Sequence, residues 1–347
     1  MTPAPIVGWV ELSGENPELA RAELDGALAA LGGRRAANCG ASAPGPGFEA
    51  VELPAVGTLV ALAGRLAFAR RVLRALSESS DSALEERFRR EGSAAGTAAF
   101  RPLAASRGTL VAPSALRLAD AFRAGGGRID LDHPDRRFWV QPGSNDHLRA
   151  FEEVAAVDRT GFNARRMPRL PFQRPVSLAP RLGRIAANLA AVRPGDPIVD
   201  PFVGTGALLL EAALLGGRVS GVDRDPEMVR GAVRNLGRFG VAPERLSIGD
   251  AADAFAPSDA DGWAAVLTDP PYGRASGSAG EPPDALVGRV LPRWAERVRP
   301  SGRVVVVLPG GPDPLPAPWV RTVSVADRVH RSLTREFRVY RRAGELD

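Results

Sequence analysis

The distribution of apolar residues in the first part of the chain predicts a small α/β arrangement. Residues 6–12 predict a strand, and residues 48–53 alternate between apolar and polar side chains as a second strand does. Residues 17–31 carry apolar side chains at helical spacing, with Asn16 as the N-cap and two glycines after the last turn. Residues 58–76 are apolar with interspersed arginines, and we expect a second helix there. This βαβα order indicates a small α/β sandwich.

The pattern from residue 80 to residue 175 is weaker and predicts shorter elements. The expected helices cover residues 81–90 and 113–123, and the expected strands cover residues 97–103, 108–111, 128–131 and 138–141. Residues 146–175 mix proline, glycine, asparagine and arginine. We therefore expect a linker over this stretch, which can include a helix over residues 146–157.

From residue 176 onward, short strands alternate regularly with helices. The expected strands cover residues 197–199, 218–222, 246–248, 264–267 and 303–308, and the expected helices cover residues 180–192, 205–215, 226–239 and 284–298. Such alternation indicates a parallel, doubly wound α/β sheet. Residues 319–330 and 334–341 predict two long strands, which we expect to form an antiparallel hairpin at one edge of the sheet.

Candidate ligand-binding residues follow three successive strands of this sheet. The first strand ends in a glycine loop with a helix directly after it, and its candidate contacts are Asp200, Pro201, Phe202, Gly204, Thr205 and Gly206. Glycines let the backbone approach a ligand, and the amides of the helix then face it. Asp223, followed by Arg224, is placed to accept hydrogen bonds from two ribose hydroxyls. Asp250, followed by Ala251, is placed to accept from an adenine amine.

These positions favour S-adenosylmethionine over other nucleoside cofactors. The dinucleotide fingerprint needs a third glycine or alanine, but Leu209 stands at that position. A phosphate-binding P-loop needs a lysine, and the chain contains none. S-adenosylmethionine has a ribose and an adenine but no pyrophosphate, so we expect it as the cofactor.

The fourth strand leads into the segment Thr268–Gly273, which contains Asp269, Pro270, Pro271 and Tyr272. Consecutive prolines stop the strand and remove two backbone donors. The Asp269 carboxylate and the Pro270 carbonyl then form a rigid pair of acceptors beside the Tyr272 ring. This arrangement suits a planar group with an exocyclic amine, so we interpret these residues as catalytic. The alternative is an ordinary transition from strand to loop, since Asp and Pro are common turn residues.

The composition is that of a globular protein, with 44% hydrophobic and 24% charged residues. No apolar run reaches the roughly 18 residues of a membrane span, and no signal-peptide pattern is present. The single cysteine, Cys39, fits a reducing cytoplasm, and the three histidines have no ligand spacing. We therefore expect a cytoplasmic protein, acting as a monomer, without a membrane segment or a metal site.

Arginine supplies all the basic residues, and the net charge is +5. Residues 159–184 contain seven arginines and no acidic residue, and residues 321–342 contain seven arginines against two acidic residues. Basic runs of this kind occur on nucleic-acid-binding proteins, although a solvated surface is the simpler alternative. The residues that we expect to contact RNA are Arg181, Arg331, Thr334 and Arg335.

These motifs resemble those of the archaeal THUMP-containing tRNA guanine-N2 methyltransferases, and the members that act on guanine-10 are the nearest fit. The segments that carry the resemblance are Glu11–Pro17, Ala22–Leu24, Asp200–Gly206, Glu211–Ala212, Thr268–Gly273 and Arg331–Arg335. The resemblance implies a ferredoxin-like segment over residues 1–79 and a THUMP domain over residues 80–145 that holds the tRNA acceptor end. It also implies a Rossmann-like, S-adenosylmethionine-dependent methyltransferase domain over residues 176–347.

Two other functions stay open at the level of sequence. A methyltransferase for another exocyclic amine, such as guanine N2 in ribosomal RNA or adenine N6 in DNA, would use the same chemistry. A non-catalytic THUMP protein that binds RNA could keep the same fold. The aspartates at four strand ends favour an enzyme. The resemblance of the N-terminal half to an RNA-binding module favours an RNA substrate over DNA.

Overall fold

The computed structural model describes residues 5–36, 44–94, 96–103, 112–142, 147–175, 177–253, 255–257, 260–271, 283–331 and 333–345. The chain forms two compact units, each built from several segments. Unit 1 consists of residues 1–14, 32–64 and 69–157, and unit 2 consists of residues 15–31, 65–68 and 158–347.

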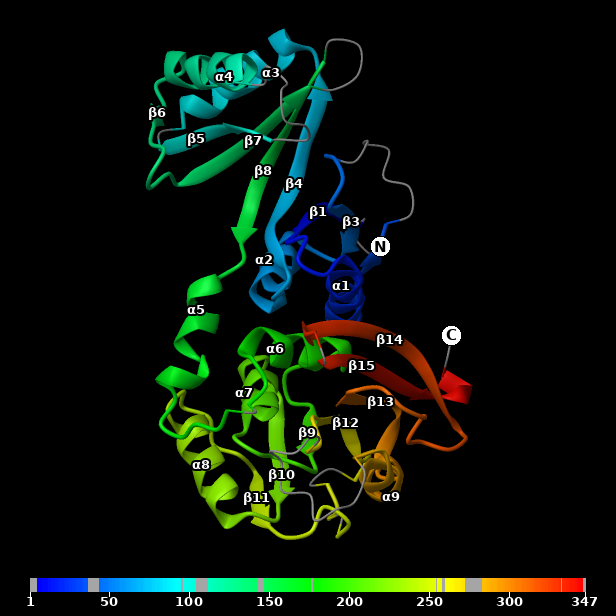
Figure 1. The fold of residues 1–347 in the computed structure, drawn as a ribbon. Coiled ribbons are helices and arrows are strands. Elements are labelled where there is room, and N and C mark those ends of the chain that lie inside the picture. Colours follow the sequence, from blue (N-terminus) through cyan, green and yellow to red (C-terminus); the bar gives the residue numbers. More distant parts are fainter. Residues whose placement is uncertain are drawn as a thin grey trace. The chain divides into compact units, whose positions relative to one another are not determined.

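Unit 1 is built on an eight-stranded sheet with the strand order β2-β3-β1-β4-β8-β7-β5-β6 (Figure 1). Its strands are β1 (Ile6–Leu12), β2 (Arg34–Arg35), β3 (Phe48–Leu53), β4 (Ala69–Ser79), β5 (Thr97–Pro102), β6 (Arg128–Ile129), β7 (Arg136–Pro142) and β8 (Leu148–Ala156). Along the sheet, the neighbouring strands β2, β3, β1, β4, β8 and β7 pair antiparallel to one another. Strand β5 pairs in parallel with both β7 and β6.

Three helices accompany this sheet: α2 (Val56–Arg65), α3 (Asp81–Gly92) and α4 (Ala112–Ala124). Helices α3 and α4 pack together at one end of the sheet (Figure 1). Their shared core contains Phe88, whose ring meets those of Phe100 and Phe138 edge-on at 4.9 Å. Burial of these large rings, together with the aliphatic side chains around them, stabilises this part of unit 1.

Two expectations for unit 1 are wrong, because two segments that were expected to be helical form strands. The helix expected over residues 58–76 ends at Arg65, and β4 follows it. Residues 148–156 form β8 rather than a helix. Both strands are rich in helix-forming residues, but they pair with each other and place Arg74 against Glu152. Tertiary pairing therefore overrides the local propensity.

The other elements expected within the described residues are confirmed, apart from shifts of a few residues at their ends. The strand expected over residues 108–111 lies outside the described residues. The domain boundaries expected at residues 79, 145 and 175 stay predictions. The two compact units divide the chain elsewhere, because residues 15–31 and 65–68 belong to unit 2.

Unit 2 contains a seven-stranded sheet with the order β11-β10-β9-β12-β13-β15-β14 (Figure 1). Its strands are β9 (Pro197–Asp200), β10 (Arg218–Asp223), β11 (Arg245–Ile248), β12 (Trp263–Thr268), β13 (Val298–Leu308), β14 (Trp319–His330) and β15 (Leu333–Arg342). The first five are parallel, and β15 pairs antiparallel with β13 and β14. The doubly wound sheet and the hairpin at its edge are thus confirmed.

Helices accompany this sheet on its faces (Figure 1). The helical elements are α1 (Pro17–Leu31), α5 (Arg159–Ala164), η1 (Met167–Arg169), α6 (Pro180–Leu189), α7 (Ala207–Leu214), α8 (Pro226–Gly237), α9 (Pro283–Ala295) and η2 (Ala343–Glu345). Helix α9 packs Leu291 and Trp294 into a buried cluster with Val199 and Val266 of the central strands. Because these strands are buried, their sequences are almost entirely apolar, as expected for a parallel sheet.

Helix α1 is far from α6 in sequence but packs against it in unit 2. Glu23 of α1 is fully buried, and its carboxyl accepts hydrogen bonds from Ala67 N (2.7 Å), Phe68 N (2.8 Å) and Asn188 Nδ2 (2.9 Å). Burial raises the pKa of Glu23 to about 7, although these three hydrogen bonds act in the opposite direction. The N-terminal helix is therefore an integral part of the body that contains the parallel sheet.

Close approach of α1 and α6 requires a glycine at position 26. A Cβ added to Gly26 would lie 2.1 Å from the carbonyl oxygen of Asn188. We expect Gly26→Ala to lower the free energy of unfolding by roughly 1–3 kcal/mol, because the two helices must separate. Chemical denaturation measures this change.

A matched control is Gly288→Ala in α9, where an added Cβ meets no atom within 4 Å. This substitution should raise stability by roughly 0.5–1 kcal/mol through helix propensity alone. Equal stability of the two variants would contradict the packing of α1 on α6.

Candidate cofactor and catalytic site

The candidate site lies where the direction of the sheet connections reverses, between β9 and β12. Strand β9 pairs in parallel with β10 on one side and with β12 on the other. In open α/β sheets, ligands bind at the carboxyl ends of the strands at such a switch point. Asp200 is the last residue of β9, and Asp269 directly follows β12.

The loop after β9 has the backbone conformation that its glycines predict. Gly204 has a φ of +52° and Gly206 a φ of +81°, both in the left-handed region that glycine favours. A Cβ on Gly206 would also lie 3.1 Å from the Cβ of Ala232 in α8. The turn at Gly206 starts α7 directly, so the first amides of α7 are close to the loop.

Asp200 joins the two central strands from inside the protein. It is 1% exposed, and its Oδ1 accepts hydrogen bonds from Phe202 N and from the Thr268 hydroxyl, both at 2.9 Å. Burial raises its pKa to about 7, with a further contribution from the charges of Asp269 and Asp223. This carboxyl group therefore positions the glycine loop and the end of β12 relative to each other.

Asp223 supports the same loop from the end of β10. One carboxylate oxygen accepts from Gly204 N at 2.8 Å, and the other accepts from Asp225 N at 3.0 Å. Burial raises the pKa of this group, while the two hydrogen bonds lower it. Each oxygen keeps a second lone pair. The carboxylate can thus accept from two ribose hydroxyls while it holds the loop.

The end of β11 supplies a more open part of the site. Asp250 is exposed, and its Oδ1 accepts from Ala252 N at 2.7 Å. The neighbouring Ala251 is buried, and its carbonyl accepts from the indole N–H of Trp294 at 2.7 Å. Arg224, after β10, is exposed on the surface. The structure thus places the predicted cofactor contacts of three strands at one edge of the sheet.

The predicted catalytic segment begins at the same edge. Asp269 and Pro271 are half-buried, and Pro270 is buried. The Thr268–Asp200 hydrogen bond fixes the residue that precedes this segment. Tyr272, also predicted as catalytic, lies outside the described residues.

The predicted RNA contacts lie on two other elements. Arg331 is exposed at the turn between β14 and β15, and Thr334 and Arg335 follow it on β15. Arg181 on α6 instead makes intramolecular contacts. Its guanidinium binds the carbonyl of Ala67 at 2.9 and 3.1 Å and the carboxylate of Glu15 at 2.7 Å.

Sequence reasoning missed two polar side chains that hold the glycine loop. Asn235 in α8 is 1% exposed; its amide exchanges two hydrogen bonds with the backbone of Phe172 and donates to Thr205 O at 3.0 Å. The hydroxyl of Ser177 lies 3.0 Å from that of Thr205. Asn235 lies on the apolar face of a helix that the sequence predicts. This position could have indicated the contact, because a buried amide needs hydrogen-bond partners.

Neither a metal centre nor a membrane span is found in the described part of the chain. No group of three or more His, Cys, Asp or Glu side chains among the described residues could hold a metal ion. Within the same residues, no helix combines the length and apolar character needed to cross a bilayer.

Comparison with known proteins finds related sequences over nearly the whole chain. A family model described as an RMKL-like methyltransferase domain matches residues 168–321. The tRNA (guanine(10)-N2)-dimethyltransferase of Methanothermobacter thermautotrophicus is 32% identical, over 96% of this chain and 98% of its own length. The protein of the same name from Pyrococcus abyssi is 33% identical over 60% of this chain and 63% of its own length.

A solved structure with a similar fold spans nearly the whole chain. The crystal structure of TrmN from Thermus thermophilus superposes with a TM-score of 0.51 at 20% identity, covering 97% of this chain and 99% of that one. At this identity the similarity supports the fold alone.

The raised pKa of Asp200 predicts a specific dependence of stability on pH. Between its ordinary value of 3.8 and about 7, the folded protein keeps a proton that the unfolded chain has released. The free energy of unfolding should therefore fall as the pH rises through this window, by at most about 1.4 kcal/mol per pH unit from this group.

Asp200→Asn keeps the accepting oxygen but cannot titrate. Denaturant unfolding at several pH values should give a smaller decrease for this variant, with a remainder from Glu23, whose pKa also lies at about 7. Identical pH profiles of the two proteins would contradict the buried, protonated state of Asp200.

Proposed function

The chain belongs to the family of tRNA (guanine(10)-N2)-dimethyltransferases, and we propose that it methylates the exocyclic N2 of guanine-10 in tRNA. It is a methyltransferase that uses S-adenosylmethionine as its methyl donor. The observation that carries the assignment to this chemistry is the hydrogen bond between Thr268 and Asp200. This hydrogen bond ties the residue before Asp269 to the end of β9, at the switch point of the sheet, which supports a role for Asp269 and Pro270 beside the glycine loop.

The residues around the glycine loop fit this donor. The carboxylate of Asp223 has a free lone pair on each oxygen for the ribose hydroxyls, and the exposed carboxylate of Asp250 suits the adenine amine. Gly204 has no side chain to obstruct the ligand, and a Cβ there would meet no atom closer than 3.9 Å. When bound, the donor supplies a methyl group on a positively charged sulfur. Nearby carboxylates favour such a cation.

We propose that Asp269 and Pro270 bind and orient the guanine amine. The carboxylate of Asp269 and the carbonyl of Pro270 accept its two N–H hydrogen bonds, and Pro271 adds no competing donor because it lacks an N–H. The proton that N2 releases passes to a carboxylate oxygen of Asp269. The ring of Tyr272, whose role is predicted from sequence alone, stacks on the base. Positioning and electrostatics supply most of the rate in such a site.

The target base must leave its stem to reach this segment, at a cost of a few kcal/mol. We propose that the ferredoxin-like and THUMP regions predicted within residues 1–145 bind the tRNA and offset this cost. The hairpin residues Arg331, Thr334 and Arg335 then contact backbone phosphate near the flipped base. The names of the relatives support two successive methylations of the same nitrogen. We expect the protein to act as a monomer in the cytoplasm.

Asp269→Ala tests the catalytic assignment. We expect methyl transfer to fall roughly 100-fold or more, because the amine loses a charged acceptor in the transition state. The affinity for S-adenosylmethionine, measured by calorimetry, should stay largely intact. Asp269→Asn, which keeps one acceptor oxygen, is the matched control and should retain more activity than Asp269→Ala. Wild-type turnover by Asp269→Ala would reject the assignment.

The substrate is tested with tRNA transcripts and isotopically labelled donor, followed by mass spectrometry of the modified nucleotide. We expect one or two methyl groups on guanine-10 and none on a transcript with inosine at that position, since inosine lacks only the exocyclic amine. Methylation of ribosomal RNA or DNA but not tRNA would favour the other amine substrates. Donor binding without transfer to any nucleic acid would favour a non-catalytic RNA-binding protein.

A further inference from the structure

The basic run of residues 159–184 divides into two groups of arginines. Five of the seven have acidic or carbonyl partners within unit 2, namely Arg159, Arg165, Arg174, Arg181 and Arg184. Arg166 and Arg169 are exposed, and neither side chain has a hydrogen-bond or ion-pair partner among the described residues. Contacts within the protein therefore explain five of the seven arginines, but not Arg166 and Arg169.

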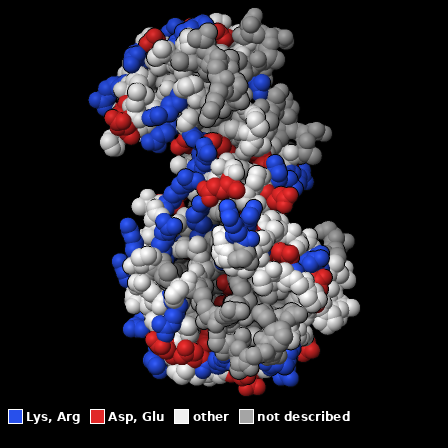
Figure 2. Space-filling model, in the orientation of Figure 1, with Lys and Arg blue, Asp and Glu red and all other residues white. Residues whose placement is uncertain are grey.

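Arg166 and Arg169 lie at the two ends of one short turn. Arg169 N donates to Arg166 O at 2.9 Å, and η1 covers Met167–Arg169. Figure 2 shows basic side chains along the flank of unit 2 that carries α5 and α8. Arg166 and Arg169 therefore belong to one short turn on a basic flank.

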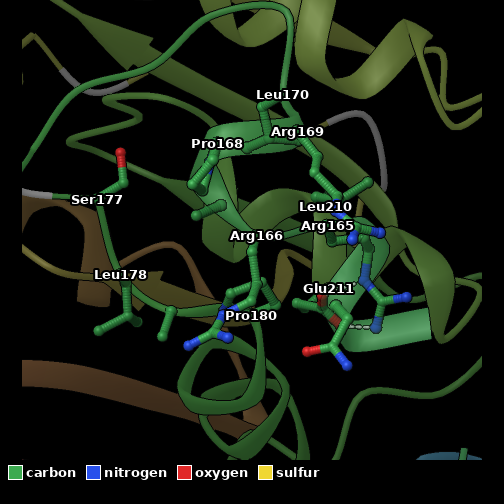
Figure 3. A pocket seen from close by; sticks show the side chains of 13 residues that line it. Arg165, Arg166, Pro168, Arg169, Leu170, Ser177, Leu178, Pro180, Leu210 and Glu211 are labelled. Carbon is green, nitrogen blue, oxygen red and sulfur yellow. Dashed lines mark hydrogen bonds and ion pairs between the residues drawn. The ribbon is translucent and has the colours of Figure 1, made fainter. Parts of the chain in front are cut away.

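Both arginines line a cavity of about 630 Å³ (Figure 3). Its apolar wall is formed by Pro168, Leu170, Leu178, Pro180 and Leu210. In Figure 3, the side chain of Arg166 lies near Leu178 and Pro180. Arg165 forms an ion pair with Glu211 in the same view. A cavity with apolar walls and charged groups suits a ligand that has both an anionic and an uncharged part.

The cavity has an excess of positive charge. Glu211 is 1% exposed and is shared by Arg165 at 2.6 Å and Arg184 at 2.9 Å. Burial lowers the pKa of Arg184, and repulsion from Arg165 acts in the same direction. One carboxylate therefore faces two arginines, and Arg166 and Arg169 add two further charges. An anion is the ligand that this balance favours.

The cavity is also joined to the glycine loop. Ser177 lines it, and the hydroxyl of Ser177 lies 3.0 Å from that of Thr205 in the loop. Ala207, the first residue of α7, lines it as well. A ligand in this cavity would therefore lie next to the glycine loop, which is proposed to contact the methyl donor.

We propose that this cavity binds one nucleotide of the tRNA backbone, with its phosphodiester between Arg166 and Arg169 and its sugar against the apolar wall. The proposal rests on the proposed tRNA substrate and adds a binding site on the methyltransferase body itself. The planar guanidinium groups can each bind two phosphate oxygens, which a flexible lysine does less specifically. The site would hold the RNA strand close to the target base.

The test compares the wild type with the double variant Arg166→Gln/Arg169→Gln, using an unmodified tRNA transcript. Binding is measured over a range of salt concentrations. We expect weaker binding at low salt and a log–log salt slope that is smaller by roughly one unit, because at least one phosphate contact is lost. The affinity for S-adenosylmethionine, measured without RNA, should not change.

Two further variants make the result specific. Arg166→Lys/Arg169→Lys keeps the charge and should retain most of the salt slope. Arg293→Gln/Arg297→Gln on α9 removes the same charge from side chains that bind the carbonyls of Ala252 and Arg293, and should leave the slope unchanged. Unchanged tRNA binding in the Arg166/Arg169 variant would overturn the proposal, as would a loss of donor affinity with the salt slope intact. Neither outcome would affect the substrate assignment, because the modified nucleotide of the wild-type reaction is mapped independently.

Discussion

The hydrogen bond from the Thr268 hydroxyl to Asp200 Oδ1 is the interaction on which the site depends. It connects the ends of β9 and β12, the two strands between which the sheet connections reverse. The same oxygen receives Phe202 N, so one buried carboxyl group sets the course of the glycine loop as well as the start of the Asp269 segment. A ligand bound by the loop is therefore held in a defined position relative to the acceptor pair.

This arrangement concentrates acidic groups at one edge of the sheet. Burial is the main cause of the raised pKa of Asp200, and repulsion from the charges of Asp269 and Asp223 adds to it. A positively charged ligand relieves part of this repulsion. The sulfonium of the methyl donor is such a ligand, so the cluster that holds the loop also provides a favourable field for the donor.

Much of the site was predictable because parallel strands end at the same edge of a sheet. The positions of Asp200, Asp223, Asp250 and Asp269 after successive strands were sufficient to bring them together. Contacts made across the fold were not predictable. β4 and β8 have helix-forming sequences and become strands only because they pair with each other. The buried amide of Asn235 also acquires its role only once α8 packs beside the glycine loop.

The contacts of the arginines could not be predicted from the sequence either. The sequence identified a basic run over residues 159–184 but could not say which arginines are engaged within the protein. Arg181 was expected to contact RNA, yet it binds Glu15 and the carbonyl of Ala67. Arg166 and Arg169 have no such partners among the described residues. Only the folded arrangement of α1, α6 and η1 separates structural arginines from those available to a ligand.

The most direct measurement is a crystal structure of the protein with tRNA and a non-reactive analogue of the methyl donor. We predict that the N2 atom of the flipped guanine lies within hydrogen-bond distance, about 3.2 Å or less, of both the Asp269 carboxylate and the Pro270 carbonyl. A guanine held by other groups, with the Asp269 side chain directed away from its amine, would contradict it.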